Sequence, residues 1–129
     1  MIWLAIAIGG AMGALARYGT TQAVVSVSGT TLASPIATLM VNIIGSAIMG
    51  ACYGFLAGGG GFSEPMRLFL MVGFLGALTT FSTFSLDVIM LAERGQVILA
   101  VLYATGSVVV SVSIFLMLYS LFRGLGSVG

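Results

Sequence analysis

The sequence predicts an all-α membrane protein with four transmembrane helices, and both its composition and its long apolar segments support this fold class. The chain has 129 residues, of which 60% are hydrophobic and 5% are charged. Because soluble domains carry about a quarter of charged residues, this chain has too few to cover a soluble surface. A hydrocarbon core of about 30 Å needs about 20 apolar helical residues. The chain contains four such stretches, and we treat residues 1–129 as one transmembrane domain.

The predicted spans follow one another with short connections. They cover residues 2–27, 35–57, 65–91 and 96–122. Helices are expected because a lipid-exposed backbone must satisfy its own hydrogen bonds. Pro35 and Pro65 mark the starts of the second and third spans, since a proline in the first turn loses no helical hydrogen bond. Ser34 and Ser63 are the expected N-caps.

Several function classes are excluded by what the chain lacks. With a net charge of +1 it offers no basic patch for nucleic acid. It has no histidine, no lysine and a single cysteine, Cys52, so neither a soft-metal site nor a nucleophile–base set is expected, and the chain is not predicted to be an enzyme. The N-terminus, "MIWLAIAIGG", has no positively charged start and is interpreted as a retained first span rather than a signal peptide.

The arginines are divided evenly between the two membrane sides. Arg67 and Arg123 fall on the side of the N-terminus, whereas Arg94 and Arg17 fall toward the other. Because arginine bias sets orientation, this balance predicts insertion in both directions and an antiparallel homodimer, unless helix packing decides. Near its span end, Arg17 either reaches the interface or raises the anion concentration at a pore mouth.

Polar side chains form two rows inside the spans, each with a spacing of four residues. The rows are Thr38, Asn42 and Ser46 in the second span and Tyr103, Ser107 and Ser111 in the fourth. Such residues often join membrane helices by hydrogen bonds. Alternatively, the rows form two walls of a narrow path for a small ion that must lose its water. The walls would then offer hydrogen-bond donors but no fixed charge.

The third span contains "GFLGALTTFSTF", which is too polar for a plain membrane helix. Gly76 predicts a close approach or a break there, and a broken helix releases carbonyls that can bind a cation. Phe81 and Phe84 are three residues apart and share a helix face. They are either a packing pair or ring edges that contact a small anion, because an aromatic edge is positive.

Three motifs together resemble the Fluc (CrcB) family of fluoride channels. They are "GGAMGALARYG" at residues 9–19, "TLMVNIIGSAIMG" at residues 38–50 and "GFLGALTTFSTFS" at residues 73–85. The chain departs from the family's usual pattern at Ala77, where a second glycine is common, and at Asp87, where glutamate is common.

The resemblance implies a passive, fluoride-selective channel that exports fluoride across the bacterial inner membrane, built as a dual-topology antiparallel homodimer with two pores. The residues it places along the fluoride path are Phe81, Phe84, Asn42, Tyr103, Ser107, Thr38, Thr83 and Ser111. It implies a pore vestibule at Arg17. It also implies a structural sodium ion at the dimer interface, held by the carbonyls of Gly76 and Thr79.

Two other functions remain open at this point. A small multidrug/proton antiporter is also a four-helix, dual-topology dimer, but it needs a carboxylate deep in the first span, and this chain has none there. A membrane subunit without transport activity would explain the four helices but not the paired polar rows.

Overall fold

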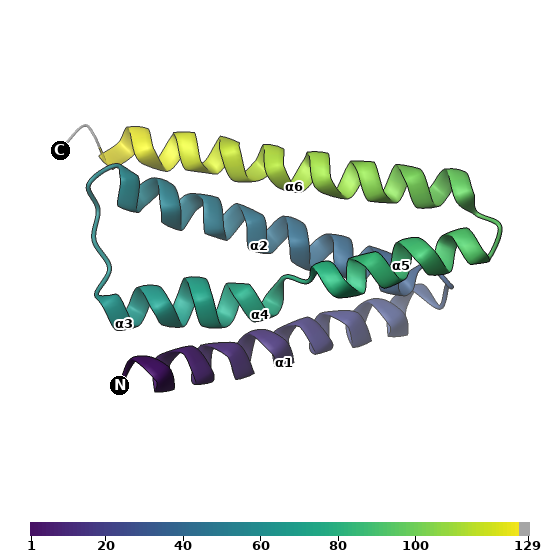
Figure 1. Cartoon of the computed structure of the whole chain (residues 1–129), viewed down its shortest axis with the longest axis horizontal. Coiled ribbons are helices and arrows are strands. Elements are labelled where there is room, and N and C mark those ends of the chain that lie inside the picture. Colours follow the sequence, from purple (N-terminus) through teal and green to yellow (C-terminus); the bar gives the residue numbers. More distant parts are fainter. Residues whose placement is uncertain (127–129) are drawn as a thin grey trace.

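The structure, a computed structural model, describes residues 1–126 and consists of helices joined by short turns (Figure 1). The helices are α1 (Ile2–Ser28), α2 (Ala33–Ala57), α3 (Glu64–Arg67), the π-helix η1 (Leu68–Leu75), α4 (Gly76–Leu78), α5 (Phe81–Glu93) and α6 (Val97–Gly126). Four helical segments are long and apolar enough to cross a membrane, with α3 to α5 together forming the third. The four predicted spans are therefore confirmed, and the chain is a multi-pass membrane protein.

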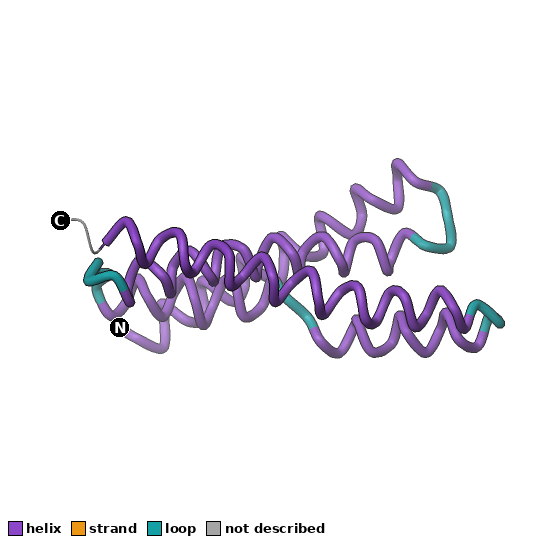
Figure 2. The backbone as a smooth tube through the Cα atoms, turned by 90° about the horizontal axis from the view of Figure 1, so that it is seen from above, coloured by secondary structure: helices purple, strands orange, loops and turns teal. Residues whose placement is uncertain are grey.

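The four spans form an elongated bundle with its connections at the two ends. In Figure 1, α1 starts at the end where α6 finishes and where the loop between α2 and α3 lies. The α1–α2 and α5–α6 turns lie at the other end, where the Arg94 guanidinium donates to the Thr31 carbonyl at 3.0 Å. Figure 2 shows one further loop, between the two ends, at the break in the third span.

The closest helix pairs are not neighbours in sequence. α1 packs mainly against η1, and α2 packs mainly against α6. Glycines make both approaches possible: a Cβ at Gly9 would overlap the Phe69 carbonyl, and a Cβ at Gly50 would overlap the Phe115 carbonyl. Small residues commonly allow membrane helices to approach this closely.

The third span is broken, as predicted. Of the two residues expected at the break, Thr79 lies there, next to Thr80, whereas Gly76 is still helical. Gly76 is helical, with φ −63° and ψ −33°. Thr79 (φ −76°, ψ 153°) and Thr80 (φ −151°, ψ 122°) are extended, and α5 begins at Phe81. An eight-residue π-helix, Leu68–Leu75, precedes the break, and π-helical turns inside helices often mark functional sites.

The prediction that Ser34 caps the second span is wrong. The α2 helix begins at Ala33, so Ser34 lies inside the first turn, and the N-cap position belongs to Leu32. The Ser34 hydroxyl instead donates to the carboxylate of Asp87 at 2.6 Å. Ser63 does occupy the N-cap position of α3, although its side chain makes no capping bond.

Candidate functional site

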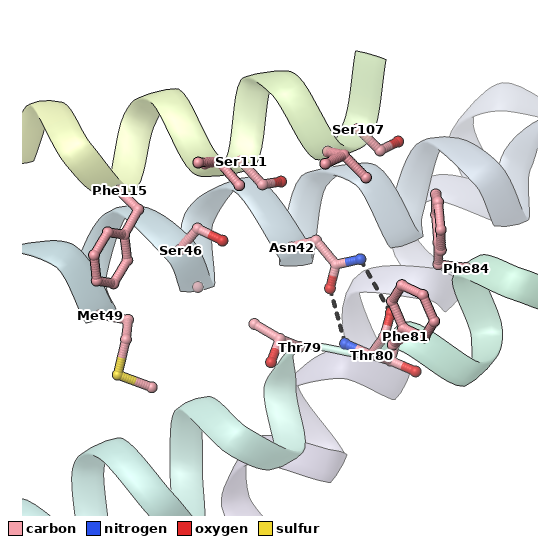
Figure 3. Close-up of a pocket in the computed structure, with 13 residues that line it drawn as sticks. Asn42, Ser46, Met49, Thr79, Thr80, Phe81, Phe84, Ser107, Ser111 and Phe115 are labelled. Atoms are coloured by element: carbon pink, nitrogen blue, oxygen red, sulfur yellow. Dashed lines mark hydrogen bonds between the residues drawn. The ribbon is translucent and has the colours of Figure 1, made fainter. Parts of the chain in front are cut away.

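A groove of about 340 Å³ lies beside the break in the third span (Figure 3). Helices α2, α5 and α6 and the break itself form its walls. Its lining brings together most of the polar and aromatic residues that the sequence singled out, namely Asn42, Ser46, Thr79, Phe81, Phe84, Ser107 and Ser111. None of the side chains that line it is charged.

The side chain of Asn42 is bound to the backbone of the break. Its Oδ1 accepts from the Thr80 N–H at 2.8 Å, and its Nδ2 donates to the Thr80 carbonyl at 3.1 Å. Both bonds are drawn in Figure 3. Asn42 thus satisfies the Thr80 N–H, which the interrupted helix leaves without a helical partner, and it also bonds to the carbonyl of the same N-cap residue.

The hydroxyls that follow the break serve the start of α5. Thr80 is the N-cap, and its Oγ1 accepts from the Thr83 N–H at 3.2 Å. The same Oγ1 donates to the Thr83 hydroxyl at 3.1 Å and lies 3.3 Å from the Ser82 hydroxyl. The polar run in the third span is therefore explained in part by capping. The structure places Thr83, a predicted path residue, in this cap.

Two buried hydroxyls on α6 have no hydrogen-bond partner among the described residues. They are the Oγ atoms of Ser107 and Ser111. Buried polar groups are nearly always paired, so each hydroxyl here is free to bond to something that enters the groove. Ser107 is only 5% exposed.

Three aromatic rings form a row beside the groove. The ring centroids of Phe81 and Phe84 are 5.4 Å apart, and those of Phe84 and Tyr103 are 5.5 Å apart, with both pairs tilted. Phe84 is buried, whereas Phe81 is 76% exposed in the single chain. The row connects the groove to a second polar cluster.

Asp87 is the centre of that second cluster. The residue is 3% exposed, and its carboxylate accepts from the hydroxyls of Ser34 (2.6 Å), Thr38 (2.7 Å) and Tyr103 (3.3 Å). Thr38 and Tyr103 were expected on the path, whereas no role was predicted for Asp87. A lone acidic residue within an apolar span was the signal that could have identified it.

Of the remaining predicted residues, Arg17 and Gly76 lie outside these two clusters, and Thr79 belongs to the groove lining. Arg17 is half-buried on α1 and is not part of the groove lining. Gly76 is exposed on the single chain, and Thr79 is half-buried at the break. Among residues 1–126, no group of three His, Cys, Asp or Glu side chains lies close enough to hold a metal ion.

Comparison with known proteins gives consistent matches along the chain. The model of the family described as "CrcB-like protein, Camphor Resistance (CrcB)" matches residues 4–119. A protein of Nitrobacter hamburgensis named "Fluoride-specific ion channel FluC 2" is 45% identical over 112 residues, which are 87% of this chain and 89% of the relative.

Two further relatives are named "Fluoride-specific ion channel FluC". The protein of Novosphingobium aromaticivorans is 43% identical, with 92% of this chain and 94% of the relative covered. The protein of Saccharophagus degradans is 42% identical, with 88% and 83% covered. With a family match over almost all of its four spans and relatives of similar length, the chain belongs to the CrcB-like protein family.

Proposed function

We propose that the chain is a fluoride-specific ion channel of the bacterial inner membrane that passively exports fluoride from the cytoplasm. The names of its relatives support this function. The observation in the structure that supports it best is the pair of buried, unpartnered hydroxyls of Ser107 and Ser111 in a groove lined by no charged side chain.

The groove suits a small, strongly hydrated anion. Hydroxyls of Ser107 and Ser111 can donate hydrogen bonds in place of water. The ring edges of Phe81 and Phe84 carry partial positive charge and can contact the anion where no donor reaches. Because no fixed positive charge lines the groove, each contact is weak enough for the ion to leave, as conduction requires.

The path continues to the cluster around Asp87. There the hydroxyls of Thr38 and Tyr103 donate to the carboxylate, and a hydroxyl has only one proton to donate. For an anion to pass, these hydroxyls must break their hydrogen bonds to Asp87 for a short time and donate to the anion instead. We place Arg17 at the mouth of the path, where its charge would raise the local fluoride concentration.

The functional unit is proposed to be an antiparallel homodimer with two pores. The single chain leaves the Phe81 ring 76% exposed beside an open groove, and a second copy would cover it. Arg67 and Arg123 lie toward one end of the bundle and Arg94 lies at the other, while Arg17 lies within α1. This weak charge bias favours insertion in both orientations.

A structural sodium ion is proposed at the dimer interface, held by the carbonyls of Gly76 and Thr79 from each copy. The residues fit such a site because the break leaves these carbonyls without their usual helical partners. The Thr80 N–H, which would bond to Gly76 in a helix, bonds to Asn42, and the Thr83 N–H, which would bond to Thr79, bonds to the Thr80 hydroxyl. Hard cations bind oxygen ligands of this kind.

The direct test is efflux from liposomes that contain the purified protein. Fluoride and chloride efflux are measured in parallel, with an ionophore to dissipate the potential and with protein-free liposomes as the blank. Fast fluoride efflux with little chloride efflux is expected. Equal rates for the two anions, or no fluoride efflux from the assembled protein, would contradict the proposal.

The antiporter alternative gains no support from the structure. Helix α1 carries no carboxylate. Asp87 bonds to residues in the first two turns of α2, so it lies toward one end of the spans rather than at their middle. A proton-coupled antiporter needs a carboxylate deep in the membrane.

A further inference from the structure

We infer that Asn42 is a positioning residue for the cation site: its amide creates the break geometry that makes the carbonyls of Gly76 and Thr79 available. The inference rests on the proposed channel and its sodium ion. It assigns Asn42 a role that differs from that of a donor to the permeating anion.

The first step concerns the Gly76 carbonyl. In a continuous helix the N–H of residue 80 would donate to the carbonyl of residue 76. Here the Thr80 N–H donates to Asn42 Oδ1 at 2.8 Å instead. Helical hydrogen bonding does continue up to Thr79, whose N–H donates to the Leu75 carbonyl at 3.0 Å. The Gly76 carbonyl therefore loses its helical donor at the break, and the side chain that takes this donor is Asn42.

The second step concerns the direction of the Thr79 carbonyl. This carbonyl belongs to the same peptide plane as the Thr80 N–H. None of the described peptide bonds is cis, and in a trans peptide the N–H and C=O point in opposite directions. Because Asn42 holds the N–H toward α2, the Thr79 carbonyl must point away from α2. One hydrogen bond thus releases one proposed ligand and orients the other.

Two further contacts hold the break against α2. The second arm of the amide, Nδ2, donates to the Thr80 carbonyl at 3.1 Å, which fixes the next peptide plane as well. Three residues further along α2, Gly45 leaves space for the Thr79 γ-methyl, which a Cβ at that position would overlap. The Thr79 hydroxyl completes the end of the first half-helix by donating to the Leu75 carbonyl at 2.9 Å. The face of α2 that carries Asn42 and Gly45 therefore fixes the backbone conformation of the break.

A positioning role for Asn42 differs in its sodium dependence from a role in fold stability alone. If Asn42 acts on the cation site, its loss must change the response to sodium, and removal of the Thr80 N–H alone must have the same effect. Partners that orient metal ligands typically change affinity by about 10–100-fold when removed. We therefore expect the sodium midpoint to rise by about that factor in both variants.

The experiment compares three variants with the native protein. Asn42→Leu removes both arms of the amide and keeps the branching of the side chain. Replacement of the Thr80 backbone amide by an ester removes the N–H but no side chain. Because the ester also makes the Thr79 carbonyl a weaker ligand, its result is interpreted only together with that of Asn42→Leu, in which this carbonyl is unchanged. The same ester at Ser82, in the first turn of α5, is the matched control, because first-turn N–H groups have no helical partner.

Two quantities are measured over a range of sodium concentrations, with N-methylglucamine as the replacement cation: the Tm of the detergent-purified dimer and fluoride efflux from liposomes. A bound ion raises the Tm with concentration. A raised midpoint in Asn42→Leu and in the Thr80 ester, with a native midpoint in the Ser82 ester, supports the inference. Size-exclusion chromatography confirms that each variant is assembled.

The opposing outcomes separate the two proposals. A native sodium midpoint in Asn42→Leu would overturn the inference, whatever the Thr80 ester shows, but would leave the channel intact. Native protein that conducts fluoride with no response to sodium in either measurement would also overturn it, since there would be no cation to position. Absence of selective fluoride efflux from the native protein would instead contradict the proposed function.

Discussion

The two phenylalanines of the third span lie in different surroundings although they are three residues apart. Phe84 is buried between Phe81 and Tyr103, whereas Phe81 is largely exposed in the single chain. A role in the path requires the ring edges of both. A role in packing alone would give Phe84 the larger effect, because it is the buried ring.

Replacement of either ring is therefore expected to reduce fluoride efflux without loss of assembly. Phe81→Ile and Phe84→Ile each remove a positive ring edge from the groove and should slow efflux about tenfold or more, which equals about 1.4 kcal/mol in barrier height. Efflux from liposomes is compared with Phe62→Ile, whose ring pairs with Phe55 away from the groove. Native rates in both test variants would contradict a role in the path.

Asn42→Asp is expected to abolish most of the efflux for an electrostatic reason. The change replaces the Nδ2 donor by a carboxylate oxygen that faces the Thr80 carbonyl and, when ionised, repels an anion in the groove. The measurement is fluoride efflux normalised to assembled protein. A rate equal to that of the native chain would show that the amide donor is dispensable.

Removal of the Asp87 carboxylate should destabilise the fold. Asp87→Ala leaves the hydroxyls of Ser34, Thr38 and Tyr103 without their acceptor, and an unsatisfied buried polar group costs about 1–3 kcal/mol. The expected result is a lower Tm in detergent. Glu93→Ala, at the exposed end of the same helix, is the control and should keep the native Tm.

At the scale of the helices, close packing of α2 on α6 depends on glycines that have no space for a side chain. A Cβ at Gly50 would overlap the Phe115 carbonyl, and one at Gly54 would overlap the Tyr119 carbonyl. At Gly10, by contrast, a Cβ would meet nothing within 4 Å. The same substitution should therefore have opposite effects at different glycines.

Gly50→Ala should destabilise the protein by about 1–3 kcal/mol, because α6 must move to make space. Gly10→Ala should be neutral or slightly stabilising, because alanine has the higher helix propensity and its methyl group enters open space. Both are measured as changes in Tm of the purified protein. Equal losses at the two positions would indicate that the α2–α6 contact is not the cause.

The sequence was sufficient to predict the four spans and the existence of the break, because both follow from local composition. It did not predict the π-helix, since a change of hydrogen-bond register leaves the pattern of apolar residues unaltered. The glycine, which is the usual local signal, placed the break at Gly76, and the family resemblance placed it at Gly76 and Thr79. The actual position, at Thr79 and Thr80, depends on Asn42, which lies on another helix.

For the polar residues too, the sequence predicts what depends on helix periodicity but not what depends on tertiary contacts. Spacing along each helix predicted that Ser107 and Ser111 share a face, and the structure places both at the groove. The same reasoning could not separate Thr38, which bonds to Asp87, from Asn42, which bonds to the break. Those partners are distant in sequence, so only the tertiary structure reveals them.

For the whole molecule, orientation in the membrane follows from the arginines at the two ends of the bundle. Ser63→Arg adds a charge at the end that carries Arg67 and Arg123, and Gln96→Arg adds one at the end that carries Arg94. Each single change should bias insertion to one orientation and reduce dimer yield.

Co-expression of the two oppositely biased chains should restore the dimer. Orientation is measured by the accessibility of a C-terminal tag to a membrane-impermeant reagent, and assembly by size-exclusion chromatography. The native chain should label from both sides. Labelling from one side only would contradict dual topology.

The pairing of α1 with η1 and of α2 with α6 has a consequence for biosynthesis. Each of the first two spans has its main partner two spans later in the chain. At about 5–20 residues per second, translation leaves α1 and α2 in the bilayer for seconds before those partners emerge. Assembly therefore cannot proceed hairpin by hairpin, and the glycine surface of α2 faces lipid until α6 has been inserted. A chain that ends before the fourth span should remain unfolded in the membrane and be a target for quality-control proteases.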